Sequence, residues 1–133
     1  MIIGEVDFPK PLLAAQRAGE LAIFAGAGVS MPAPSNYPNF KDLANRVAAG
    51  KLIADPEEPL DHFLGRLADT GVQVHQQVSR MLDDPASQPN SLHFDLLNLF
   101  RSPNFIRVVT TNFDSHFANA ERVVGELRQK FRK

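Results

Sequence analysis

Two short clusters in this sequence combine residue types that could bind a ligand and take part in chemistry. The first, residues 26–30, reads GAGVS and offers two glycines and the hydroxyl of Ser30. The second, residues 110–114, reads TTNFD and offers two hydroxyls, an amide and a carboxylate. Gly26 and Gly28 can take backbone angles closed to other residues and let a ligand approach the main chain, and a following helix start presents free N–H groups suited to phosphate. An ordinary strand-to-helix turn is the alternative for the first cluster.

Each cluster directly follows a predicted strand. Residues 21–25, LAIFA, are a short continuous apolar run, which is typical of a parallel strand buried on both faces. Residues 105–110, FIRVVT, are rich in β-branched side chains and follow a Ser-Pro-Asn turn signal. In α/β sheets, ligands bind at the carboxyl ends of parallel strands. We therefore expect an α/β fold in which the two clusters lie together.

Helical periodicity predicts the elements that position these strands. The residues after Pro11 are rich in alanine and leucine and predict a helix that Gly19 ends. Residues 31–40 contain three prolines and predict a loop beside the candidate site. Further helices are expected at residues 40–49, capped by Asn39 or the loop before it, at 60–69, at 72–82, from Ser91, and from about Asp114 onward. The alternating start of residues 72–82 leaves a strand open there.

Composition limits the possible functions. A chain of 133 residues with 44% hydrophobic content predicts one domain with a sizeable core. The formal net charge of −1 gives no basic footprint, so we expect no nucleic-acid binding. Residues 121–133 are basic, which favours a solvated helix end over an anionic partner. No apolar stretch approaches the ~18 residues of a membrane span, and the N-terminus is acidic where a signal peptide is basic, so no membrane contact and a cytoplasmic location are expected.

Two missing features narrow the chemistry further. The sequence has no cysteine, which excludes disulfides, a thiolate nucleophile and cysteine-ligated zinc, and we expect no metal. The turn at Gly26 and Gly28 begins like the dinucleotide fingerprint GxGxxG, but Met31 stands where the third glycine would fall. No acidic residue follows on a second strand at the spacing of a ribose contact. These departures argue against an NAD dehydrogenase.

Three segments, taken in order along the chain, resemble the sirtuin superfamily. They are FAGAGVS after one strand, PNF at the end of the proline-containing loop, and VVTTNFD after a second strand. The sequence looks most like the bacterial sirtuin-like domains that cleave NAD in antiphage defence. The resemblance covers about residues 10 to 120. It implies a partial Rossmann-like parallel sheet in a single domain over residues 1–133, truncated at its C-terminal side, with a helical insertion at about residues 41–85.

The resemblance also implies roles for individual residues. The glycine-rich segment would receive the NAD phosphates and the adjoining ribose, and the ring of Phe40 would lie near the nicotinamide ribose, although Asn39 replaces the aspartate usual there. In the second cluster, Asn112 is the expected catalytic residue, and Asp114 would help to hold the nicotinamide amide. The expected NAD-binding residues are Gly26, Ala27, Gly28, Ser30, Phe40, Thr110, Thr111, Asn112 and Asp114.

The chemistry of the reaction supports these residue types independently. Breaking the bond between nicotinamide and ribose discharges a cationic leaving group and builds an oxocarbenium-like centre, so a protein mainly has to orient the ribose and a water. An asparagine amide can donate and accept at once. Simpler alternatives remain: Asn112 could only shape a turn, and Asp114 could only cap the following helix.

A sirtuin-type site also uses a histidine base downstream of the TTNxD segment. His62 and His75 precede that segment and are interpreted as surface or helix residues, and His93 is interpreted as structural. His116 follows Asp114 by two residues, which places it on the first helical turn and makes it a weak candidate for the base.

The leading hypothesis is that the complete domain hydrolyses NAD to nicotinamide and ADP-ribose. The alternatives are a module that senses NAD or ADP-ribose without turnover, an oligomerisation module, and an NAD-dependent protein deacylase, for which the usual cysteine-bound zinc is lacking. Because an unpaired sheet edge promotes association, we also expect a second copy or a partner effector protein to complete the sheet.

Overall fold

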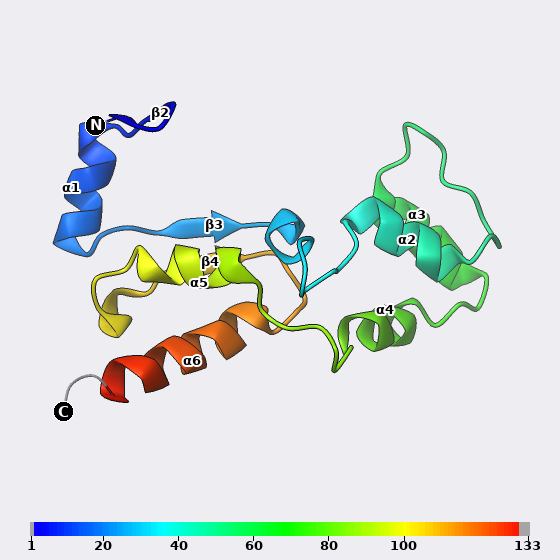
Figure 1. Cartoon of the computed structure of the whole chain (residues 1–133). Helices are drawn as coiled ribbons and strands as arrows, with labels where there is room; N and C mark the ends of the chain where they lie inside the picture. The colour runs from blue at the N-terminus through cyan, green and yellow to red at the C-terminus, as the bar shows by residue number, and fades with distance from the viewer. Residues whose placement is uncertain (1, 131–133) are drawn as a thin grey trace.

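A two-stranded parallel sheet lies at the centre of the fold (Figure 1). It is formed by β3 (Ile23–Ala25) and β4 (Val108–Thr110), with Ile23 opposite Val108 and Ala25 opposite Thr110. The computed structural model describes residues 2–130, and this part of the chain is a mixed α/β fold, mostly helical, with six α-helices. The prediction of an α/β class with these two strands is therefore confirmed. Both strands are shorter than predicted: β3 begins at Ile23 instead of residue 21, and β4 begins at Val108, after a 3₁₀ turn, η2 (Pro103–Phe105).

Two helices cover one face of this sheet. Helix α5 (Ser91–Asn98) and helix α6 (His116–Lys130) contact each other, and their buried Leu97, Ala120 and Val124 form a core with Val108 of β4. The opposite face is bare, because the side chain of Phe24 is 82% exposed and its neighbour in register, Val109, is 51% exposed. The expected burial of the first strand on both faces is thus wrong for the described residues. Completion of the sheet by a second copy or a partner stays a prediction.

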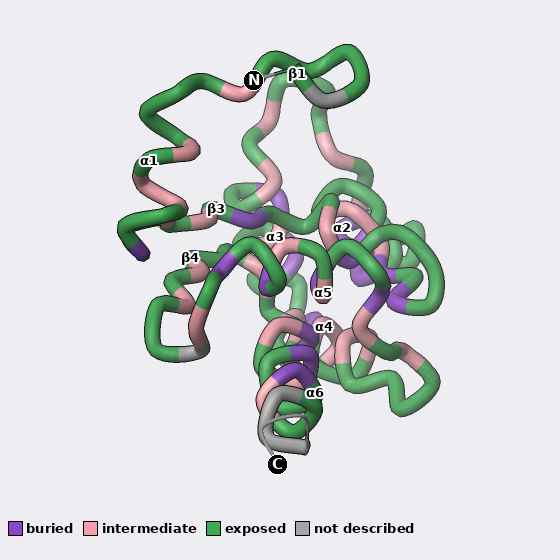
Figure 2. The backbone as a smooth tube through the Cα atoms, turned by 60° about the vertical axis from the view of Figure 1, so that its left-hand side comes forward, coloured by how far each residue is buried: buried purple, intermediate pink, exposed green. Residues whose placement is uncertain are grey.

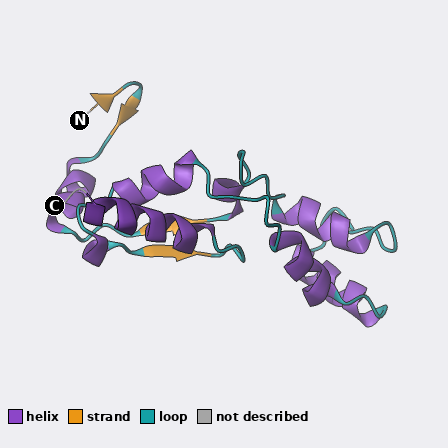
Figure 3. Cartoon of the chain, turned by 60° about the horizontal axis from the view of Figure 1, so that its bottom comes forward, coloured by secondary structure: helices purple, strands orange, loops and turns teal. Residues whose placement is uncertain are grey.

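Three further helices form a separate body, which we call the three-helix unit. It consists of α2 (Phe40–Ala48), α3 (Leu60–Asp69) and α4 (Val74–Leu82), which pack around a small core of their own. That core is made of Ala44, Val47, Ala48, Phe63, Leu67 and Val72. Figures 1 and 3 show this unit set apart from the sheet. The helix predicted over residues 72–82 is confirmed against the strand alternative, and Asn39 caps α2 by accepting the N–H of Asp42.

The N-terminal segment lies mostly at the surface. Helix α1 (Lys10–Ala18) has proline in its first turn and ends, as predicted, at Gly19, which takes the left-handed conformation with φ of 74°. Before it, β1 (Ile2–Ile3) and β2 (Val6–Asp7) form a short antiparallel hairpin that the sequence analysis did not predict. No residue of α1 is fully buried, and Figure 2 shows a mostly exposed course through this region.

Two connectors join the three-helix unit to the sheet, and they are hydrogen-bonded to each other. In the first, residues 31–39, the hydroxyl of Ser35 donates to the carbonyl of Gln88 over 2.8 Å. In the second, residues 83–90, the hydroxyl of Ser87 donates back to the carbonyl of Ser35 over 2.6 Å. The buried Asn90 also links the two connectors to η1 (Ala27–Ser30) and α5. Its Nδ2 donates to the carbonyls of Val29 and Pro32, and its Oδ1 caps α5. These bonds hold the connectors beside the first cluster.

Candidate functional site

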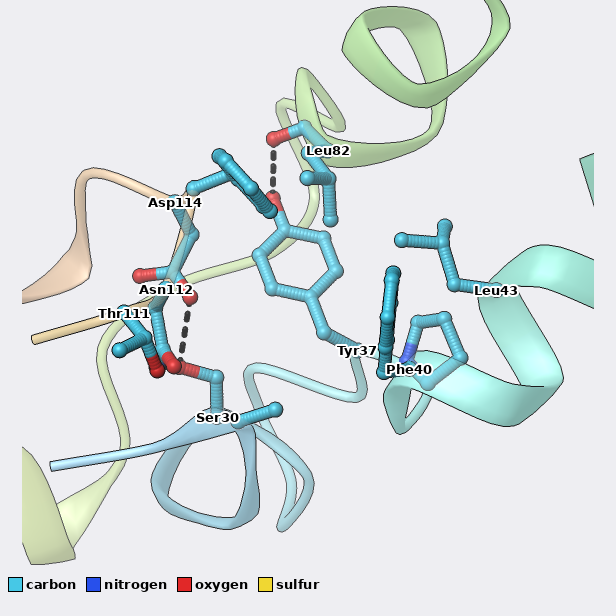
Figure 4. Close-up of a pocket in the computed structure, with 11 residues that line it drawn as sticks. Ser30, Tyr37, Phe40, Leu43, Leu82, Thr111, Asn112 and Asp114 are labelled. Atoms are coloured by element: carbon cyan, nitrogen blue, oxygen red, sulfur yellow. Dashed lines mark hydrogen bonds between the residues drawn. The ribbon is translucent and has the colours of Figure 1, made fainter. Parts of the chain in front are cut away.

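A cavity of about 430 Å³ lies at the carboxyl ends of β3 and β4 (Figure 4). It collects side chains from both predicted clusters, from the proline-containing loop and from the three-helix unit. Its lining residues are Ala27, Ser30, Tyr37, Pro38, Phe40, Leu43, Leu82, Thr111, Asn112, Phe113 and Asp114. The expectation that the two clusters meet at the ends of parallel strands is therefore confirmed.

Six of the predicted binding residues line this cavity, and three do not. Those that line it are Ala27, Ser30, Phe40, Thr111, Asn112 and Asp114. Gly26, Gly28 and Thr110 belong to the same two strand ends but are absent from the cavity lining.

The two glycines do not have the special backbone angles that the sequence analysis expected. Gly26 is extended, with φ of −106°, and Gly28 lies in a 3₁₀ turn, η1 (Ala27–Ser30), without a positive φ. The expectation was wrong because the 3₁₀ turn reverses the chain with angles open to any residue. A Cβ atom at either position would meet nothing within 4 Å. Neither backbone strain nor tight packing thus requires glycine here.

The hydroxyl of Ser30 is the centre of the polar end of the cavity. It is almost fully buried, with 1% of the residue exposed, and it donates to Oδ2 of Asp114 over 2.8 Å. Two nitrogens also approach it, Nε2 of His93 at 3.2 Å and Nδ2 of Asn112 at 3.3 Å. Because a serine hydroxyl has one proton, already directed to Asp114, both nitrogens must donate to Ser30. All the hydrogen-bonding capacity of this hydroxyl is therefore used.

This arrangement fixes the protonation of His93. With the proton on Nε2, the ring accepts the backbone N–H of Asn90 at Nδ1 over 3.2 Å, while the Asn90 Oδ1, 3.0 Å from the same nitrogen, accepts backbone N–H groups of α5. Burial lowers the pKa of His93, and the neighbouring His116 lowers it further, against the opposing effect of Asp114. His93 is accordingly neutral. In this geometry His93 donates a hydrogen bond to Ser30 and accepts none from it, so His93 cannot take the proton of the hydroxyl. Ser30 is therefore not an activated nucleophile of the serine-hydrolase type.

His116 lies behind the cavity wall. It begins α6, on the first helical turn as predicted, and is 3% exposed. Its Nε2 lies 2.9 Å from the hydroxyl of Ser87, whose proton points to the carbonyl of Ser35, so Nε2 is the donor. Its ring stacks on Tyr37 with centroids 5.0 Å apart. The other ring nitrogen, Nδ1, is buried and has no partner among the described residues. His116 is absent from the cavity lining, and this position does not favour it as a catalytic base.

The amide of Asn112 is held in one orientation with its oxygen unused. Its Nδ2 donates to Ser30, whereas its Oδ1 is buried and has no partner among the described residues. Buried acceptors normally have a partner, so this oxygen is suited to a donor brought by a ligand or a water. The backbone N–H of Asn112 bonds the hydroxyl of Thr110, which also fits the simpler turn role. Asp114 likewise has two roles, since its Oδ1 accepts the N–H of His116 at the start of α6.

The apolar walls of the cavity were not predicted from the sequence. Tyr37 comes from the predicted loop, and an aromatic residue between Ser-Asn and Pro could have been noticed there. Leu43 and Leu82 come from the three-helix unit, and no local pattern reveals that they face a distant strand end. Phe113 stands inside the TTNFD cluster, and its side chain is 78% exposed. Asn90 and the bond from His93 to Ser30 were missed for the same reason, because both depend on contacts between distant segments.

A second cavity of about 760 Å³ adjoins the first. It is formed mainly by helices of the three-helix unit, and it shares Phe40, Leu43, Leu82, Phe113 and Asp114 with the first cavity. Its remaining walls include the apolar Leu64, Ala68, Val74 and Val78. The five shared residues form a common wall of the two cavities.

The neutrality of His93 predicts an acid-sensitive fold. An unfolded chain binds a proton at His93 near its ordinary pKa of about 6.5, whereas the folded chain resists it, so folding stability is lost as the pH falls through and below 6.5. We expect the free energy of unfolding, measured by urea denaturation, to fall between pH 7.5 and pH 5.5. His93→Gln keeps a donor for Ser30 and should flatten this dependence. His62→Gln, at an exposed position, is the control, and an unchanged slope in His93→Gln would refute this assignment.

Among the described residues there is no group of three or more side chains that could hold a metal ion. No helix in the described range is long and apolar enough to cross a membrane. Comparisons of the chain with protein-family models, with curated proteins and with solved structures find no match.

Proposed function

We propose that this chain is an NAD-binding domain of the sirtuin-like type, with a partial Rossmann-like sheet, and that the complete domain hydrolyses NAD to nicotinamide and ADP-ribose. In this proposal the three-helix unit is the helical insertion expected at about residues 41–85 of a single domain. The observation that carries the proposal is the state of Asn112. Its amide nitrogen is fixed by Ser30, and its oxygen remains a buried acceptor without a partner, at the polar end of an apolar cavity.

The shape and lining of the cavity suit a nicotinamide ring. Nicotinamide is a flat aromatic ring with one amide, and the cavity has aromatic walls with its polar groups gathered on one side. The aromatic side chains are Tyr37, Phe40 and Phe113, and the polar ones that can bond a ligand are Thr111, Asn112 and Asp114. The hydroxyl of Ser30 also lines the cavity, but its bonds within the protein use all its capacity. A volume of about 430 Å³ lies within the range of ~300–1,000 Å³ typical of small-molecule sites.

The same residues suit the chemistry of cleavage. Oδ1 of Asn112 can accept a hydrogen bond from a ribose hydroxyl or from the attacking water, and its fixed nitrogen prevents the amide from turning away. The carboxylate of Asp114 stands beside it, held by Ser30 and by the start of α6, and each of its oxygens has capacity for a further donor. A fixed negative charge at this place favours the positive charge that develops on the ribose.

The turn that contains Gly26 and Gly28, which we call the glycine turn, suits the diphosphate part of NAD. A Cβ at Gly26 or Gly28 would project into open space, so the absence of side chains leaves the backbone of η1 open to a ligand.

A second candidate function is binding of NAD or ADP-ribose without turnover. One observation favours it: none of the residues that line the first cavity is a histidine. Both buried histidines donate to serines, His93 to Ser30 and His116 to Ser87, so neither Nε2 is available as a base. Binding through the same cavity needs no base, and a sensor would use the same residues.

Asn112→Ala is the first test of the proposed function. The substitution removes the free acceptor, so nicotinamide release from NAD should fall by about 100-fold or more, the usual effect of losing one preorganised polar group. Release is measured by chromatography after incubation of each chain with NAD. Asn119→Ala is the matched control, because that amide bonds only Ser115 and lies outside the cavity.

The outcomes of this experiment separate the hypotheses. Equal release by Asn112→Ala and the native chain would contradict the assignment of Asn112. Calorimetric binding of NAD by the native chain without any release would support the sensor. Transfer of an acyl group from a lysine peptide to NAD would instead indicate deacylation, and absence of both binding and release would refute the proposal.

Gly28→Ala tests the role of the glycine turn. Because Gly28 has no positive φ and open space around it, alanine should leave stability unchanged or raise it by about 0.5 kcal/mol. Its methyl group would obstruct the approach of a diphosphate, so NAD affinity measured by calorimetry should fall by about tenfold. Gly125→Ala in α6 is the control, since it also meets open space and lies away from the cavity. Unaltered NAD affinity in Gly28→Ala would show that the turn does not contact the ligand.

A further inference from the structure

Tyr37 contacts three parts of the molecule that are distant in sequence. Its backbone N–H donates to the carbonyl of Ser30 over 2.9 Å, at the end of the glycine turn. Its hydroxyl donates to the carbonyl of Leu82 over 2.6 Å, at the end of α4. Its ring stacks on His116, the first residue of α6, at an interplanar angle of 9°. The residue is 9% exposed, and Figure 4 shows its ring between the polar side of the cavity and the wall formed by Leu43 and Leu82.

These contacts bridge two bodies whose larger contacts between helices and strands lie within each body. Helices α2, α3 and α4 contact one another, whereas α5 contacts α6 and η1, and β3 pairs with β4. The first cavity lies between these bodies: Asn112 and Asp114 belong to the sheet side, while Phe40, Leu43 and Leu82 belong to the three-helix unit. The width of the cavity therefore depends on how the three-helix unit is held relative to the strand ends.

The hydrogen bond from Tyr37 to Leu82 joins Tyr37 to the end of α4, where the apolar wall of the cavity lies. Leu82 is the last residue of α4, and the final carbonyls of a helix have no partner inside the helix. The hydroxyl of Tyr37 satisfies one of them, and the side chain of the same leucine lines both cavities. On its other side, the stack on His116 fixes the Tyr37 ring to the body that carries Asn112.

We propose that Tyr37 is a positioning residue that holds the three-helix unit at the distance from Asn112 that ligand binding requires. This inference rests on the proposed function for the identity of the ligand, NAD. Tyr37 does not act on the reacting bond. It keeps the apolar wall, made of Phe40, Leu43 and Leu82, in place opposite the polar end of the cavity.

Tyr37→Phe is the decisive variant, because it keeps the ring and its stack and removes only the hydroxyl. Without this hydroxyl, the wall made of Phe40, Leu43 and Leu82 is in place for only part of the time, and the apparent affinity for NAD falls in proportion to that fraction. We therefore expect the dissociation constant for NAD to rise about tenfold. If the native chain releases nicotinamide, KM should rise while kcat stays unchanged. Amide hydrogen exchange should accelerate in α4 and stay unchanged in α5.

Thr70→Val is the matched control. Its hydroxyl also donates to a carbonyl at the end of a helix of the same unit, that of Leu67 over 2.7 Å, and Thr70 lines neither of the two cavities. A purely structural role of Tyr37 predicts that both variants lose stability and that both keep native NAD affinity in conditions where they are folded. A positioning role predicts weaker binding in Tyr37→Phe alone.

Two readouts separate this inference from the proposed function. Failure of the native chain to bind NAD would refute the proposed function, and hydrogen exchange in α4 would still decide whether Tyr37 holds the three-helix unit. Native NAD affinity in Tyr37→Phe, or equal exchange of α4 in the two proteins, would overturn the positioning role. Circular dichroism of each variant verifies that the fold is intact before either comparison is made.

Discussion

The site depends on the three hydrogen bonds that the buried hydroxyl of Ser30 makes. A buried hydroxyl without partners costs free energy, and this one is satisfied only when three segments meet around it. Asp114 accepts its proton, while His93 of α5 and Asn112 donate to it. The ends of β3 and β4 are thereby joined to the start of α5. The same bonds fix the amide of Asn112 and leave its oxygen without a partner, so one buried serine shapes both the fold of this edge and its chemistry.

The second constraint is the division of the chain into two bodies with the first cavity between them. The three-helix unit supplies apolar wall residues, and the strand ends supply polar ones. Hydrogen bonds between the connectors and the contacts of Tyr37 hold the bodies together. Such a site combines a rigid polar end with a wall whose position depends on few bonds. This combination suits a ligand with a flat, mostly apolar end.

Local patterns in the sequence predicted the elements well and the site in part. Helical spacing, the Asn39 cap and the stop at Gly19 depend on neighbours in sequence, so they could be predicted. The meeting of the two clusters followed from the geometry of parallel strands. Tyr37, Leu82 and His93 could not be predicted, because their roles depend on long-range contacts. The exposure of Phe24 was also missed, since an apolar run does not reveal whether anything covers its second face.

In the proposed function, the nicotinamide end of NAD occupies the cavity at the strand ends. Intermolecular nuclear Overhauser effects between NAD and the native chain test this position of the ligand. We expect contacts from the nicotinamide ring protons to the aromatic protons of Tyr37, Phe40 and Phe113. Contacts to these rings from adenine protons alone, or contacts of NAD elsewhere on the protein and none here, would refute it.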